Sequence, residues 1–169
     1  MDGVYLHLAM NHIPVIASVF GLIILGYGVL RRSDPLTSAG LVIMVLTGLV
    51  AIPVYLTGEP AEEVAEGLPG VIESMIGAHE DLAQFALWSA IIGGVVAIAS
   101  LPYRRARPEG KSGRMLVSAS LAAAAITVGT MGWTAKLGGV IRHTEIRAAS
   151  SQTATPASDN KRKEDDDDH

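Results

Sequence analysis

Four long runs of hydrophobic residues, each bounded by polar or charged positions, dominate the sequence. An α-helix rises about 1.5 Å per residue, so roughly 20 apolar residues cross a bilayer core of about 30 Å. Short connections between consecutive helices favour an up-down-up-down arrangement. The pattern therefore predicts an all-α, integral membrane four-helix bundle with spans at Ile13–Leu30, Leu36–Thr57, Leu82–Leu101 and Met115–Gly138.

Charged residues are concentrated in the connections between these runs. The first connection contains Arg31 and Arg32, and the third contains five basic residues between positions 104 and 114. The second connection, Gly58–Asp81, contains seven acidic residues and neither lysine nor arginine. The positive-inside rule then places the first and third connections in the cytoplasm. We therefore expect a multi-pass protein of the inner (plasma) membrane, with both termini and the acidic connection outside the cytoplasm.

The acidic connection also carries apolar residues at nearly helical spacing. They lie between Pro60 and Ile76 and are interrupted at Pro69–Gly70. We expect one or two short interfacial helices at the outer face, with Gly77 leading into the third span.

Composition narrows the possible classes of protein. The chain of 169 residues is about the size of one domain, and it contains no cysteine, which excludes disulfides, iron–sulfur clusters and covalently attached c-type haem. The sequence has no phosphate-binding glycine loop and no nucleophile elbow, so we expect no independent catalytic activity. Residues 1–147 form the predicted transmembrane domain, and residues 148–169 form a polar, disordered tail.

Four of the five histidines fall at the predicted outer end of the bundle. The imidazole nitrogen is a good ligand for haem iron, copper and zinc, and these histidines belong to several different helices. Arg142 is placed to pair with an acid of the outer connection or with a haem propionate. We therefore predict a cofactor or metal site whose ligands are drawn from His7, His12, His79 and His143.

The local sequence leaves two geometries open around the first two of these histidines. On a regular helix a separation of five residues turns about 500°, so His7 and His12 would not clamp one ion. Alternatively, Asn11 caps a helix that begins near His12, and His7 folds back on an extended segment. Near the last histidine, the pair Gly138–Gly139 either ends the helix or lets its backbone approach a neighbour closely.

Three functions are compatible with this set. The first is an electron-transfer protein or cytochrome subunit that binds b-type haem, with His79 as one axial ligand and His12 or His143 as the other. In that case His7 serves a second haem or a propionate. The second is a cofactor-free accessory or structural subunit of a larger respiratory or photosynthetic membrane complex. The third is an outer-face copper or zinc protein that uses three or more of these histidines and a carboxylate.

Each hypothesis has the lipid bilayer as one partner, and partner subunits or a redox protein at the outer face as others. Nucleic acid is not expected, because the topology accounts for the basic residues. For any single histidine, a hydrogen bond to a backbone carbonyl at the interface is the alternative to a ligand role. No histidine lies near the predicted cytoplasmic face, so haem at the outer face would not by itself carry electrons across the membrane.

The beginning of the chain resembles a known family. Leu6–His7, followed by His12–Ile13–Pro14, is similar to the opening of a family of small four-span bacterial membrane proteins, the domain of unknown function 2231. Its members often begin with leucine, histidine and proline, and then have a second histidine followed by an aromatic residue and proline. Here Leu8 stands in place of the first proline, and Ile13 in place of the aromatic residue.

The resemblance extends over roughly residues 5–146. His79 matches a family histidine at the start of the third span, and Gly138–Gly139 with His143 match the end of the last span. The resemblance implies a four-helix membrane fold and haem-type ligation, and it implies no established reaction. A more distant likeness is to four-helix b-type membrane cytochromes.

Overall fold

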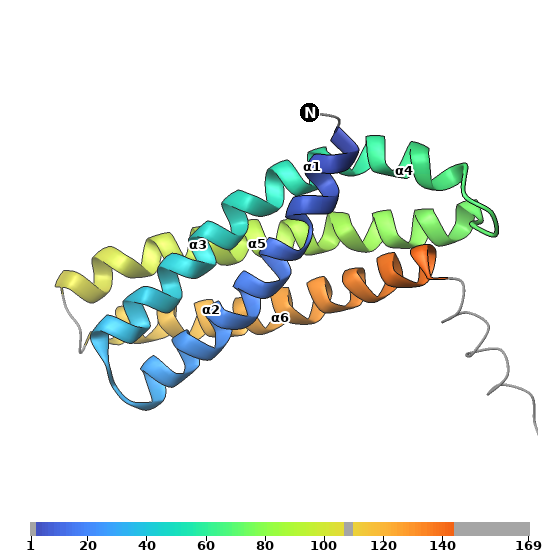
Figure 1. Ribbon diagram of the computed structural model, residues 1–169. Helices are drawn as coiled ribbons and strands as arrows, with labels where there is room; N and C mark the ends of the chain where they lie inside the picture. The colour runs from blue at the N-terminus through green and yellow to red at the C-terminus, as the bar shows by residue number, and fades with distance from the viewer. Residues whose placement is uncertain (1–2, 107–109, 144–169) are drawn as a thin grey trace, which may run out of the picture.

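Six helices make up most of the part of the chain that the computed structural model describes, residues 3–106 and 110–143 (Figure 1). No strand occurs among these residues, so the all-α prediction is confirmed. The polar tail predicted from residue 148 onward lies outside the described residues. In chain order the helices are α1 (Gly3–Met10), α2 (His12–Leu30), α3 (Asp34–Leu56), α4 (Gly58–Glu66), α5 (Glu73–Ala106) and α6 (Lys111–Arg142).

Four helical stretches are long and apolar enough to cross a membrane, as the hydrophobic runs predict. In the most apolar window of each stretch, only 28% to 39% of the residues are buried inside the protein. Most apolar side chains therefore lie on the outside of the bundle, where a lipid environment would cover them. The four stretches are Gly3–Leu30, Asp34–Leu56, Glu73–Arg104 and Lys111–Ile141.

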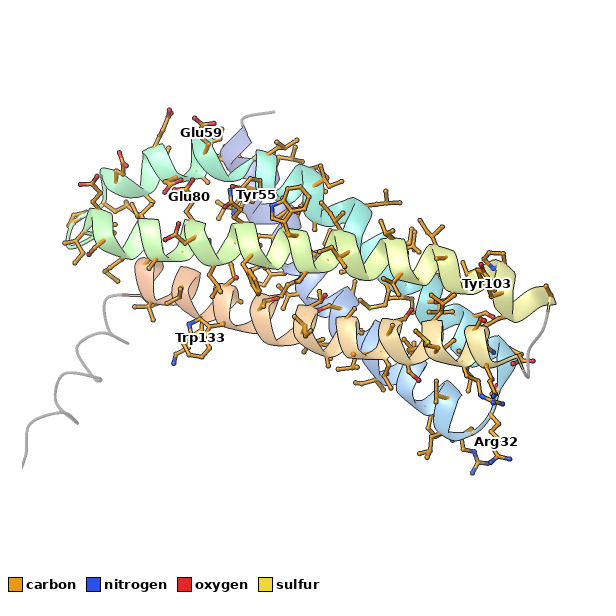
Figure 2. The ribbon with its side chains drawn as sticks, turned by 180° about the vertical axis from the view of Figure 1, so that it is seen from behind. Arg32, Tyr55, Glu59, Glu80, Tyr103 and Trp133 are labelled. Carbon is orange, nitrogen blue, oxygen red and sulfur yellow. The ribbon has the colours of Figure 1, made fainter. Side chains whose placement is uncertain are left out.

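The long helices pack side by side in an elongated bundle (Figure 1). Helix α2 packs along α3, α3 along α5, and α5 along α6, and α6 also contacts α2. The short helices α1 and α4 pack on each other at one end, whereas the turn between α2 and α3 lies at the other. Figure 2 shows the same polarity in the charges, with Glu59 and Glu80 at the α1–α4 end and Arg32 at the opposite end.

Glycines allow α3 to approach its two neighbours closely. A Cβ atom at Gly40 would lie 2.5 Å from the backbone nitrogen of Leu25 in α2. A Cβ atom at Gly48 would lie 2.8 Å from the carbonyl oxygen of Ala90 in α5. Such distances leave no room for a side chain, so these contacts are made backbone to backbone, as is common between membrane helices.

Two clusters of buried apolar residues fill the space between the helices. The cluster nearer the α2–α3 turn contains Leu25, Leu41, Met44, Ala97, Val117 and Ala124. The second cluster consists of Ala51, Ala86, Ala90 and Met131. At the basic end, the guanidinium of Arg104 donates to the carboxylate of Asp34, which links the end of α5 to the start of α3.

The outer connection differs in part from its prediction. One short helix, α4, occupies its first half, and Gly70 turns the chain with φ of 77°. Helix α5 then begins at Glu73, so Gly77 lies inside this helix instead of leading into it, and His79 lies in its second turn. The polar residues before the apolar run are therefore helical, because hydropathy locates the apolar part of a helix and not its ends.

Two further local predictions are corrected at the helix ends. Asn11 has helical dihedral angles and makes no side-chain capping bond, and His7 belongs to helix α1, so it is not on an extended segment. Gly138–Gly139 does not end the last helix, because α6 continues to Arg142. The structure instead agrees with the other alternative, a close approach, because the side chain of His79 lies next to Gly138.

We expect Gly40→Ala to destabilise the bundle, because the new methyl group would force α2 away from α3. Overpacking of this kind costs about 1–3 kcal/mol. Gly129→Ala is the matched control, since a Cβ atom there meets nothing within 4 Å, and alanine is favoured over glycine in a helix by about 1 kcal/mol. Thermal unfolding of the detergent-solubilised protein should rank the variants as Gly129→Ala, wild type, Gly40→Ala. Equal unfolding temperatures for the two variants would contradict the close approach.

Candidate functional site

His7 connects the first helix to the end of α3. Its Nδ1 atom donates to the carbonyl oxygen of Val54, at 3.0 Å, and the Oγ1 atom of Thr57 lies 3.4 Å from the same nitrogen. Val54 lies in the last turn of α3, where backbone carbonyls have no partner within the helix. The Oγ1 atom of Thr57 also donates to this carbonyl, at 3.0 Å, so the imidazole is a second side-chain donor to it, and the ring is partly buried there.

His79 connects α5 to α6 in the same manner. Its Nδ1 atom donates to the carbonyl oxygen of Thr134, at 3.0 Å. In an α-helix, residue i+4 overlies the carbonyl of residue i, and here that residue is Gly138. A Cβ atom at Gly138 would lie 3.1 Å from Cε1 of His79. The missing side chain at Gly138 therefore leaves room for the ring to reach the second lone pair of the Thr134 carbonyl.

The two imidazoles are close enough for the charge of His7 to act on His79. They come from different helices and are both partly buried. A carbonyl oxygen only accepts hydrogen bonds, so in each neutral ring the proton resides on Nδ1 and the lone pair on Nε2. A histidine held in this way presents Nε2 as a potential metal ligand, since its other nitrogen fixes the tautomer and the ring orientation.

The other two predicted ligands lie elsewhere at this end. His12 is exposed at the first residue of α2. His143 is exposed directly after α6, and its backbone nitrogen donates to the carbonyl of Gly139. The side chain of Arg142 lies outside what the structure describes. Of the four predicted histidines, His7 and His79 are thus the two that lie within electrostatic range of each other.

The described histidines, aspartates and glutamates form no group of three or more that could hold a metal ion. A site made of His7 and His79 therefore offers two protein ligands. Two imidazoles from different helices are a common set for haem iron, whereas zinc sites use at least three protein ligands.

A group of carboxylates borders this end of the bundle. Glu62 on α4 is near Glu80 on α5 and near Glu59 and Glu66 on its own helix. Figure 2 shows Glu59, Glu80 and Tyr55 at this end. Partial burial, together with repulsion first from Glu80 and then from Glu66 and Glu59, raises the pKa of Glu62 above that of an ordinary glutamate.

Sequence reasoning missed the groups that hold the histidines. Val54 and Thr134 act through backbone carbonyls, which carry no signal in the side-chain pattern. One signal was available in the spacing of Thr134 and Gly138, since a glycine four residues after a helical residue uncovers its carbonyl. Only the fold, however, shows that His79 is the donor.

Comparison with known proteins adds no relative to this description. No family model matches the sequence, and neither the curated proteins nor the solved structures give a match. The case for a function therefore depends on the residues themselves.

We expect Gly138→Ala to displace the ring of His79 by a few tenths of an ångström and to weaken its bond to Thr134. Gly139→Ala is the matched control, because a Cβ atom at Gly139 meets nothing within 4 Å. Both variants gain the same helix propensity, so their difference isolates the clash, which should be about 1–3 kcal/mol in the free energy of unfolding. Denaturation in detergent measures this difference, and the NMR signals of the His79 ring should move only in Gly138→Ala. Identical stabilities and identical ring signals would contradict the contact.

Glu62 gives a prediction for the dependence of stability on pH. A carboxyl whose pKa is higher in the folded than in the unfolded protein favours folding while it is protonated. This contribution is fully present below the ordinary glutamate pKa of about 4.3 and is lost as pH rises through the raised pKa. Glu62→Gln should therefore raise the unfolding temperature at neutral pH and flatten its decline with increasing pH.

The control for this measurement is Glu63→Gln, at an exposed neighbouring position of the same helix. It should leave the profile of unfolding temperature against pH nearly unchanged. The interpretation fails if both variants alter the profile equally, or if Glu62→Gln lowers stability at neutral pH.

Proposed function

We propose that this protein is a membrane-embedded electron-transfer protein, or a cytochrome subunit, that binds b-type haem through His7 and His79. One observation carries the proposal. Two partly buried imidazoles from α1 and α5 lie within electrostatic range of each other, and each is fixed through Nδ1 by a backbone carbonyl. Compared with the sequence-based expectation, His7 replaces His12 or His143 as the partner ligand of His79.

The number of available ligands favours haem over copper or zinc. Haem brings four nitrogen ligands of its own, so the protein has to supply only the axial positions. A zinc site needs at least three protein side chains, and the described residues offer no such group. The pair His7 and His79 therefore fits the haem hypothesis better than the metal-ion hypothesis.

The chain's own residues would define the properties of such a site. A bound haem would supply one-electron redox chemistry, and ligation by two histidines leaves no open position for a substrate. The carbonyls of Val54 and Thr134 hold the two rings in one tautomer and make Nε2 more basic. The acidic side chains around Glu62 lie at the same end of the bundle, where negative charge would favour the oxidised, more positive state of a bound iron.

We further propose that the bundle is inserted in the inner membrane with up-down-up-down topology and with both termini outside the cytoplasm. The separation of charge supports this orientation, because the acidic residues gather at the α1–α4 end and Arg32 lies at the other (Figure 2). A histidine pair at the outer end alone would exchange electrons with a partner at that face and would not carry them across the bilayer.

A cofactor-free accessory subunit is the second candidate, and one observation favours it. The bond from His7 already ties α1 to α3, and the bond from His79 already ties α5 to α6. Both histidines therefore have a structural role that needs no cofactor. The two candidates differ in whether Nε2 of each ring binds iron.

The test is an absorption spectrum of protein purified from membranes in a mild detergent. We expect a Soret band and, on reduction, the separate α and β bands of b-type haem. His79→Ala and His7→Ala should each abolish this spectrum, because each removes an axial ligand. His12→Ala and His143→Ala are the matched controls and should retain it, since neither residue belongs to the pair.

Other outcomes discriminate between the hypotheses. Protein without haem, in which His79→Ala and His7→Ala only lower stability, would favour the accessory subunit and reject the electron carrier. Loss of the spectrum in His12→Ala or His143→Ala, with retention in His7→Ala, would reject His7 as the second ligand. Zinc or copper bound in stoichiometric amount, measured by elemental analysis, would favour the metal-ion hypothesis.

A further inference from the structure

A shallow hollow lies on the outside of the bundle between α5 and α6, in the half nearer the acidic end. It has a volume of about 480 Å³ and is open on one side. Three of its lining residues come from one face of α5, and two lie one turn apart on α6. They are Ala78, Asp81, Leu82, Trp133 and Leu137.

The hollow combines an apolar lining with one acidic side chain, and one basic side chain lies next to it. Leucine and alanine side chains make most of its lining apolar, but the Asp81 carboxylate belongs to it as well. On the α6 side, the ammonium group of Lys136 lies 5.8 Å from the centre of the Trp133 ring, a cation–π arrangement. Figure 2 shows Trp133 directed away from the ribbon of α6. An anion and a cation thus flank one apolar surface.

Neither of these two charges is paired with an opposite charge of the described protein. Among residues 3–106 and 110–143, neither Asp81 nor Lys136 takes part in an ion pair, and both are exposed. Charged side chains near the end of an apolar span extend to the membrane interface, where polar groups of the lipid are available to pair with them. A ligand with one positive and one negative group would match both.

We propose that the hollow binds one phospholipid of the outer leaflet that has a zwitterionic headgroup, specifically an ethanolamine phospholipid. Its ammonium group would pair with the carboxylate of Asp81, and its phosphate with the ammonium of Lys136. Trp133 would pack against the region where the headgroup joins the acyl chains, which is where tryptophan is commonly found in membrane proteins. The inference rests on the proposed membrane insertion and orientation, but not on the histidine pair.

Charge complementarity favours this occupant over an anionic phospholipid. An anionic headgroup would satisfy Lys136 but would place no cation beside Asp81, and its negative charge would add to that of the carboxylate. A partner helix would need to cover Trp133 and both charges with groups of matching sign. The ethanolamine headgroup supplies both charges within one molecule of the surrounding bilayer.

The test is native mass spectrometry of delipidated protein titrated with dioleoyl phosphatidylethanolamine or dioleoyl phosphatidylglycerol. We expect the first lipid molecule to bind more tightly for the ethanolamine lipid. Asp81→Asn should weaken ethanolamine lipid binding by about two- to five-fold, the range for exposed ion pairs, and should remove the preference. Lys136→Gln should weaken both lipids by a similar factor, since both contain the phosphate. Trp133→Leu should weaken both as well.

Each variant has a control at an exposed position outside the hollow, with a side chain of the same charge or the same aromatic ring. These are Glu73→Gln for the acid, Lys111→Gln for the base and Trp88→Leu for the aromatic ring, and all should bind lipid like the wild type. Equal or tighter binding of phosphatidylglycerol to the wild type would overturn the proposal. So would an unchanged ethanolamine preference in Asp81→Asn, or a second protein chain that crosslinks to a photoreactive residue at position 133.

The failure of this inference is distinguishable from that of the haem proposal. Lipid binding is measured by mass and haem by its spectrum, and the variants of the two sites do not overlap. Protein without haem that still prefers the ethanolamine lipid supports the hollow and rejects the electron carrier. A haem spectrum from protein that shows no preference for the ethanolamine lipid supports the electron carrier and rejects lipid binding in the hollow.

Discussion

Helix α3 packs closely against two neighbours at Gly40 and Gly48, where it has no side chain to separate its backbone from theirs. At Gly40 the backbone of α2 fills the place of a Cβ atom, and at Gly48 a carbonyl of α5 does so. In lipid, burial of apolar surface contributes little to helix association, because the tails are as apolar as leucine. Close backbone packing takes over that role, and it fixes where α2 and α5 lie relative to α3.

The histidine site depends on this packing. His7 reaches the end of α3 from α1, and His79 reaches α6 from α5, so the distance between the rings is set by how α3, α5 and α6 are spaced. Gly138 on α6 has the same effect as Gly40 on α3. At each glycine, atoms of a neighbouring helix occupy the space that a Cβ atom would fill: the ring of His79 at Gly138, and the backbone of Leu25 at Gly40. Both the helix packing and the position of His79 therefore depend on glycines, because the absence of a Cβ atom lets a neighbouring helix or side chain come close.

Much of the fold could be predicted from the sequence, because the length of each apolar run and the charges between the runs locate the long apolar helices and their connections. The acidic and basic ends, and the gathering of histidines at one of them, followed from the same pattern. The hydrogen bonds that hold His7 and His79 could not be predicted. They depend on α1 being helical from Gly3 to Met10, which removes the extended segment, and on a carbonyl of α6 uncovered by Gly138. Neither feature produces a hydrophobic periodicity or a sequence motif from which it could be recognised.

The buried hydroxyl groups carry a consequence for biogenesis. Ser18, Thr37, Thr47 and Thr127 each donate to a carbonyl three or four residues earlier in their own helix. A hydroxyl that entered hydrocarbon with its hydrogen atom unbonded would cost several kcal/mol. Here every such donor is satisfied before any neighbouring helix arrives. With the membrane insertion proposed above, each segment can therefore leave the translocation machinery alone, and the helices can come together afterwards within the bilayer.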